Sequence, residues 1–160
     1  MKSKLISAVI LCVAALAATP ALAQDKTADA NMQILLDKVK ADKKLVVAAN
    51  MGLTEAEGKA FWPIYDEYQK ELQAINDHLG KTILAYADAY NKNSLTDDLA
   101  KRLTAEALAI DQDELTLRKT YAAKLDRVIP AKKAARYIQI ENKIRAAIRY
   151  EMAAGIPLVP

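Results

Sequence analysis

The stretch LTEAEGKAFWPIYDEYQKEL, residues 53–72, decides the fold. Thr54 fits the N-cap position of a helix, and Glu57 can complete a capping box with it, because each side chain can accept the backbone N–H of the other residue. Apolar and aromatic residues follow at intervals of three or four, which is the repeat of an amphipathic helix. The stretch therefore predicts the start of a helix, although a proline comes directly after Phe61 and Trp62.

The same apolar spacing continues far beyond residue 72 and predicts one very long helix that reaches about residue 90. Its inward row is typical of a coiled-coil seam. The polar turn at residues 91–94 ends the pattern. The predicted seam consists of Phe61, Tyr65, Tyr68, Leu72, Ile75, Leu79, Ile83, Tyr86 and Tyr90.

A shorter amphipathic helix is predicted before this one, from about residue 29 to residue 50, and Gly52 is expected to end it. A third helix is predicted to start at Leu95-Thr96-Asp97-Asp98, where Thr96 can cap it, and to end at Pro130. The predicted inward residues are Met32, Leu35, Val39, Val46 and Ala49 in the first helix, and Leu99, Leu103, Ala107, Ile110, Leu117, Tyr121, Leu125 and Val128 in the third.

A fourth helix is predicted over about residues 131–154, with Gly155 as its C-terminal cap. The tail that follows contains two prolines and cannot continue the helix. The predicted inward residues of this helix are Tyr137, Ile140, Ile144, Ile148 and Met152.

The fold class predicted from these patterns is all-α. The chain has only 4 glycines, and most of its segments favour helix. We expect four helices, two of them long, in an elongated antiparallel hairpin or bundle, with one helical domain over residues 24–154 and an irregular tail over 155–160. A sequence pattern does not separate packing within one chain from packing between chains, so a four-helix bundle and a curved dimer both remain open.

Residues 1–23 have the pattern of a secretory signal peptide: two lysines near the start, an apolar run, and the small-residue end Ala21-Leu22-Ala23. The apolar run is shorter than the roughly 20 residues of a spanning helix, so no stable membrane anchor is expected. Cleavage would remove Cys12, the only cysteine, and leave 21 Lys and Arg against 20 Asp and Glu. We therefore expect an exported protein with no thiol and a nearly balanced charge.

The sequence offers few residues for catalysis or cofactor binding. After residue 23 there is one serine, Ser94, and one histidine, His78, on different predicted elements. No nucleophile and base can be paired, and the Glu-x-x-His and Cys-x-x-Cys-His motifs of di-iron and c-type haem proteins are missing. We expect no enzyme activity, no cofactor and no metal site, with His78 exposed on a helix.

Charge is distributed unevenly between the helices. The predicted fourth helix is basic, whereas the long helix from residue 55 onward is acidic. These charges either form solvated faces and weak ion pairs or provide a basic surface that attracts acidic or unfolded partners. Nucleic acid is disfavoured as a partner by the near-neutral total. The basic side chains are Lys132, Lys133, Arg136, Lys143, Arg145 and Arg149.

Pro63 has no backbone N–H for the carbonyl of Lys59, so the long helix is expected to kink or curve there. Trp62 lies about 100° from Phe61 around the helix axis and would face a different neighbour. Trp62 therefore either packs on the first or fourth helix at the bend, or joins Phe61 and Tyr65 in an apolar patch for a partner.

The chain resembles the Spy/CpxP group of small exported helical proteins, which carry a repeated Leu-Thr-x-x-Gln motif. Leu53-Thr54-Glu55-Ala56-Glu57 matches with Glu in place of Gln, and Leu95-Thr96-Asp97-Asp98 matches the first half. The resemblance implies a dimeric, cradle-shaped periplasmic protein that holds unfolded clients without ATP or restrains an envelope-stress sensor. It also implies that Thr54 and Thr96 set helix ends.

These observations together predict a periplasmic holdase or stress-response accessory protein whose partners are unfolded proteins or an envelope sensor. Its expected contact residues are Phe61, Trp62 and Tyr65, with Lys132, Lys133 and Arg136 as steering charges. The alternatives are a ligand or metal sensor and a structural helical protein without clients.

Overall fold

The computed structural model describes residues 42–160, of which residues 44–160 form one compact unit. The predicted signal peptide at residues 1–23 and the predicted first helix up to residue 41 lie outside the described residues. The inward positions predicted at Met32, Leu35 and Val39 lie outside them as well.

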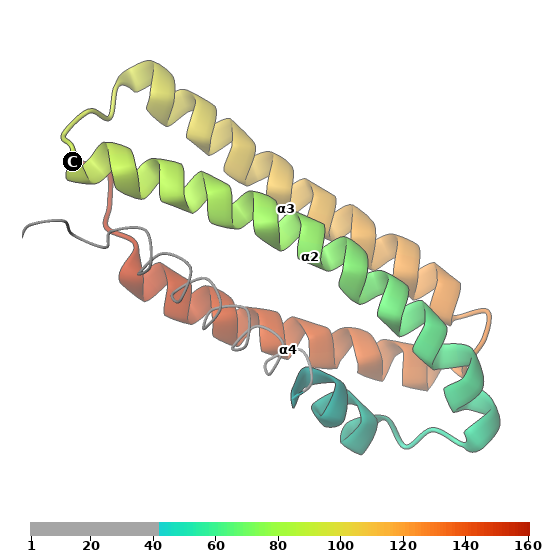
Figure 1. Ribbon diagram of the computed structural model, residues 1–160. Coiled ribbons are helices and arrows are strands. Elements are labelled where there is room, and N and C mark those ends of the chain that lie inside the picture. The colour runs from blue at the N-terminus through green and yellow to red at the C-terminus, as the bar shows by residue number, and fades with distance from the viewer. Residues whose placement is uncertain (1–41) are drawn as a thin grey trace, which may run out of the picture. The chain divides into compact units, whose positions relative to one another are not determined.

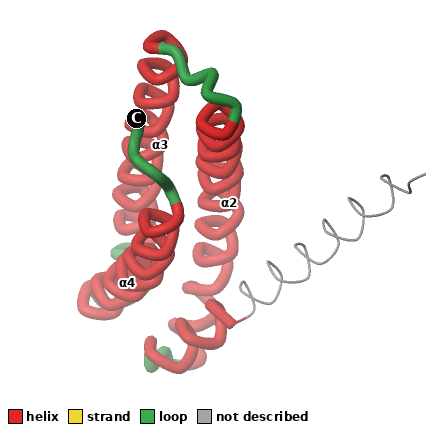
Figure 2. The backbone as a smooth tube through the Cα atoms, turned by 90° about the vertical axis from the view of Figure 1, so that its left-hand side faces the viewer, coloured by secondary structure: helices red, strands yellow, loops and turns green. Residues whose placement is uncertain are grey.

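The described residues are helical and contain no strand (Figure 2). A helical segment over residues 42–51 precedes α2 (Glu55–Asn91), α3 (Asp97–Leu125) and α4 (Ala131–Gly155). At 1.5 Å per residue, α2 is about 56 Å long and α3 about 44 Å. The predicted all-α class, with four helical elements of which two are long, is confirmed.

Both predicted N-terminal caps are present. The Thr54 hydroxyl accepts the Glu57 N–H at 3.3 Å, and the Glu57 carboxylate accepts the Thr54 N–H at 2.7 Å, which is a complete capping box. At the start of α3, the Thr96 hydroxyl accepts the Leu99 N–H at 3.3 Å. These side chains satisfy N–H groups that the first helical turn leaves without a partner.

Two residues with left-handed backbone conformation separate the helices. Gly52 has a φ of 56°, and its conformation ends the helical segment over 42–51 as predicted. Asn93 has a φ of 50° in the turn after α2, a conformation that Asn adopts more readily than most residues. The α2–α3 connection therefore follows the polar turn predicted from the sequence.

Pro130 begins α4, and the prediction that it ends α3 is wrong. Helix α3 ends at Leu125, whose carbonyl accepts the N–H groups of Val128 and Ile129 in a tight turn. Pro130 has a φ of −55° and is the N-cap of α4. The turn also places Ile129 in the core at 5% exposure, while Val128, predicted to lie inward, is 39% exposed.

Helices α2 and α3 lie side by side as an antiparallel hairpin, and α4 packs along it (Figure 1). Tyrosine rings join the three helices: Tyr68 of α2 contacts Tyr121 of α3 and Tyr137 of α4, with centroid distances of 5.3 and 5.9 Å. The buried hydrophobic cluster consists of Val47, Met51, Phe61, Tyr65, Tyr68, Leu117, Tyr121, Leu125, Ile129, Ala134 and Tyr137.

Besides Val128, four predicted seam positions differ from the structure. In the helical segment over 42–51, Val47 and Met51 are buried, whereas Val46 is 47% exposed and Ala49 is exposed, a shift of one to two positions. On α3, Ala107 is exposed. On α4, Ile148 is 50% exposed. The apolar spacing alone does not show which of two adjacent apolar residues has a neighbouring helix to pack against.

Candidate partner-binding site

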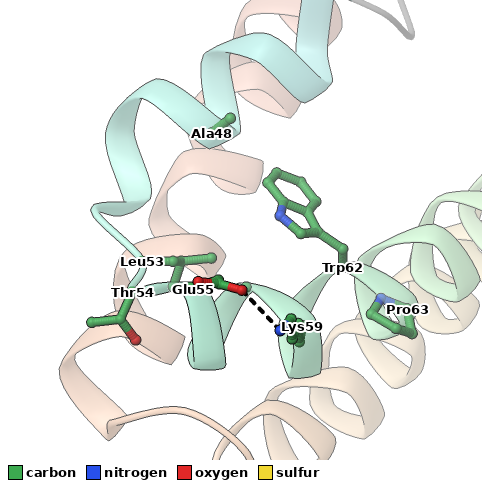
Figure 3. Close-up of a pocket in the computed structure, with 8 residues that line it drawn as sticks. Ala48, Leu53, Thr54, Glu55, Lys59, Trp62 and Pro63 are labelled. Carbon is green, nitrogen blue, oxygen red and sulfur yellow. Dashed lines mark ion pairs between the residues drawn. The ribbon is translucent and has the colours of Figure 1, made fainter.

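A hollow lies between the helical segment over 42–51 and the first turns of α2 (Figure 3). Its volume is about 630 Å³, and more of its lining is apolar than polar. The capping box fixes the start of α2, and Gly52 turns the chain so that the two helical pieces face the same space. The hollow is lined by Ala48, Leu53, Thr54, Glu55, Gly58, Lys59, Trp62 and Pro63.

Trp62 provides the largest side chain of the hollow. It is half-buried, and its ring packs edge-on against Phe61 and Tyr65 at centroid distances of 5.0 and 5.3 Å. Its indole nitrogen lies close to Gly58 and points into the hollow in Figure 3. Within residues 42–160, the indole N–H has no hydrogen-bond acceptor. The hollow therefore presents an apolar ring surface together with a hydrogen-bond donor.

Charged side chains surround this ring in balanced pairs. Lys44 lies over the Trp62 ring at 5.2 Å and forms an ion pair with Asp66 at 2.8 Å. Glu55 and Lys59, one helical turn apart, form an ion pair at 2.8 Å on the rim. Because each charge has an opposite charge beside it, the hollow does not favour a strongly charged ligand.

The apolar patch predicted from Phe61, Trp62 and Tyr65 does not form on the surface. Phe61 is 0% exposed and Tyr65 is 3% exposed, so both belong to the core. Tyr137 of α4 covers Phe61 at a ring distance of 5.1 Å. Trp62 packs beside the helical segment over 42–51, as one of the two alternatives predicts, and it alone of the three lines the hollow.

The three predicted steering charges have different surroundings. Lys132 is exposed on α4. Lys133 donates to the Glu57 carboxylate at 2.5 Å and to the Gly52 carbonyl at 2.9 Å. Arg136 donates to the Asn50 carbonyl at 3.3 Å. Lys133 and Arg136 therefore connect α4 to the chain around the hollow, and only Lys132 is directed wholly to solvent.

The contact between Lys133 and the start of α2 also affects the ionisation of Glu57. The hydrogen bond from Lys133, together with that from the Thr54 backbone, lowers the pKa of the Glu57 carboxyl. The carboxylate therefore stays charged at neutral pH and serves both the helix cap and the attachment of α4. The sequence predicted the capping role of Glu57 but not its contact with α4.

Three tyrosine hydroxyls inside the bundle have raised pKa values. Burial, followed by the charge of Glu141, raises the pKa of Tyr68 and of Tyr137, so both hydroxyls are neutral. Gln69 donates to Glu141 at 2.9 Å and to the Tyr137 hydroxyl at 3.2 Å. Burial and a hydrogen bond to Glu71 raise the pKa of Tyr121. None of these groups has the lowered pKa of a tyrosine nucleophile.

No group of three His, Cys, Asp or Glu side chains in residues 42–160 is placed to hold a metal ion. His78 is exposed on α2. In the same part of the chain, none of the helices combines the length and apolar character that crossing a membrane requires.

These features define an all-helical protein with an apolar surface hollow and a core of packed tyrosines. No family model, curated protein or solved structure matches this chain.

Sequence reasoning missed several parts of the hollow. It selected Trp62 but not Ala48, which lines the hollow from the helical segment over 42–51, nor Lys44 of the same segment, which lies over the Trp62 ring. The signal available was Gly52 followed directly by the capping box, because such a turn brings the end of one helix close to the start of the next. The pattern of apolar residues could not show which face of residues 42–51 turns toward Trp62.

Proposed function

We propose that this protein is an exported, ATP-independent holdase or envelope-stress accessory protein that binds apolar segments of unfolded or partner proteins. The observation that carries the proposal is the hollow at Trp62, in which an aromatic ring and an indole N–H face solvent together. An apolar side chain of a client can rest on the ring while a carbonyl of the client backbone accepts the N–H.

Further exposed apolar side chains support binding of extended clients. Leu84 of α2 is 70% exposed, Leu108 of α3 is 65% exposed and Tyr150 of α4 is 74% exposed. None of the three lines the hollow, and single exposed apolar residues are common on protein surfaces, so they do not define a site by themselves. The resemblance to the Spy/CpxP group supports export to the periplasm and action without ATP.

The proposal is tested by diluting a chemically denatured client into buffer with the purified protein and without nucleotide, and by measuring light scattering. We expect suppression of aggregation at a near-equimolar ratio. Trp62→Ala is expected to lose most of this suppression while the thermal unfolding midpoint falls only modestly, because the side chain is half-buried. Leu84→Ala, which removes an exposed apolar side chain outside the hollow, is the matched control and is expected to retain suppression.

Absence of suppression with several unrelated clients contradicts the proposal. Equal loss of suppression in Trp62→Ala and Leu84→Ala contradicts the assignment of the hollow. Since Trp62 is the only tryptophan of the chain, its fluorescence reports on the hollow directly. We expect its emission to shift when a client peptide binds.

A second candidate is a sensor of a small apolar ligand, and the size of the hollow favours it. A volume of about 630 Å³ falls within the range of pockets that bind small molecules. A ligand that binds the folded state raises the unfolding midpoint by mass action. An unfolding midpoint that rises with a small apolar compound, combined with no protection of clients, would favour the sensor.

A further inference from the structure

The two halves of α4 are held to the rest of the bundle in different ways. In the first half, Ala134 is 2% exposed and Tyr137 is 0% exposed, and the Tyr137 ring packs on Phe61 and Tyr68 of α2. Residues 142–155 are all described, and none of their apolar side chains is buried. Apolar burial is the main source of packing free energy, so it stabilises the first half far more than the second.

In the second half, a charged group provides the most deeply buried contact. Glu114 of α3 is 5% exposed, and its carboxylate lies 3.2 Å from Arg145 and 3.0 Å from Arg149. Arg149 also pairs with Asp111 at 2.7 Å. We call these four residues, Asp111, Glu114, Arg145 and Arg149, the Glu114 cluster.

Two further polar contacts lie at the ends of the same segment. Near its start, Arg118 of α3 donates to the Asn142 side chain at 3.1 Å. Beyond its end, the Tyr86 hydroxyl of α2 donates to the Pro157 carbonyl at 2.9 Å. All of these contacts between residues 142–157 and helices α2 and α3 are therefore hydrogen bonds or ion pairs.

Breaking such contacts costs less than separating an apolar seam. When Arg145 and Arg149 move away from Glu114, water hydrates all three charges, and this hydration offsets most of the lost ion-pair energy. Tyr137 and its aromatic neighbours gain nothing comparable from water. Local opening of a protein starts where buried apolar contacts are fewest.

We propose that residues 142–155 form a strap that opens locally from α3 about a hinge near Glu141, while the first half of α4 stays packed. Opening exposes the inward side of the strap, where Ile144 and Met152 are half-buried. The strap thereby provides apolar surface that the closed state partly covers. This inference does not depend on the proposed function, because it concerns the protein alone.

Hydrogen exchange measured by mass spectrometry on the full chain tests the strap. We expect amides in residues 142–151 to be at least about tenfold less protected than those in residues 134–141, because opening separates the two halves. Glu114→Gln leaves two arginines without their buried partner, and we expect a further loss of about tenfold or more in the strap alone. Asp113→Asn removes one charge from the exposed side of the same helix turn and is the matched control.

A second variant keeps the test decisive if Glu114→Gln folds poorly. The triple change Glu114→Leu, Arg145→Met and Arg149→Met replaces the buried Glu114 carboxylate and the two partly exposed guanidinium groups paired with it by apolar side chains. We expect it to raise protection in the strap above that of the unmodified protein, because apolar groups replacing a buried ion pair are often neutral or stabilising.

Three results would overturn the proposal. The first is equal protection along the whole of α4. The second is a Glu114→Gln variant in which strap protection does not change, since simple fraying of a helix end does not depend on Glu114. The third is a triple variant whose strap is less protected than that of the unmodified protein although its first half remains folded.

Discussion

Replacement of Phe61 by alanine measures how much the aromatic core contributes to stability. Phe61 is 0% exposed, and its ring contacts Trp62, Tyr65 and Tyr137 at centroid distances of 5.0 to 6.0 Å. Removing a fully buried phenylalanine side chain loses its transfer free energy and leaves a cavity, which together cost about 3–5 kcal/mol. Because these neighbours also bridge α2 and α4, we expect Phe61→Ala to fall in this range.

The expected loss is large compared with the about 5–15 kcal/mol by which native domains are stable. For a domain of this size it corresponds to a fall of about 10–25 °C in the unfolding midpoint. Urea and thermal unfolding followed by far-UV circular dichroism measure both quantities. Leu84→Ala, on the same helix but 70% exposed, is the matched control and is expected to change the free energy of unfolding by less than about 0.5 kcal/mol.

A loss below about 1 kcal/mol in Phe61→Ala, with an unchanged slope of the unfolding free energy against urea concentration, would refute this reasoning. Removal of a fully buried aromatic ring costs more free energy than that. Phe61 would then be a surface contact residue, as the sequence pattern alone allowed. Such a result would also weaken the assignment of Tyr137 as the residue that holds the first half of α4.

Two further predictions concern the helix starts. Thr96→Ala removes the hydroxyl that accepts the Leu99 N–H and should lower the free energy of unfolding by about 1 kcal/mol, with Thr96→Ser retaining most of it in urea unfolding. Because the pKa of Glu57 is lowered in the folded state, its contribution is present at pH values above the ordinary value of 4.5 and is lost as the pH falls through the lowered folded value. The stability difference between the unmodified protein and Glu57→Gln should therefore be largest near pH 7 and shrink under acid. A difference that stays constant with pH would exclude the Lys133 contact as its cause.

The sequence by itself determined the helical class and the starts of α2, α3 and α4. Caps at Thr54 and Thr96 are local, because each side chain bonds a backbone N–H three residues away. The seam of α2 from Phe61 to Tyr68 was also predictable. Residues spaced by four and three lie on the same face of a helix, and these residues are strongly apolar.

Tertiary structure decided everything that depends on which helix faces which. Glu114 does not belong to an apolar pattern, and its burial becomes favourable only where Arg145 and Arg149 of α4 reach it. A proline disfavours helix in the residue before it, so the sequence alone does not show whether Pro130 ends α3 or begins α4. In the structure, a turn closes α3 at Leu125, and Pro130 therefore begins α4. The hollow likewise exists only because the turn at Gly52 places the preceding segment beside Trp62, a contact between residues whose separate sequence patterns carry no information about each other.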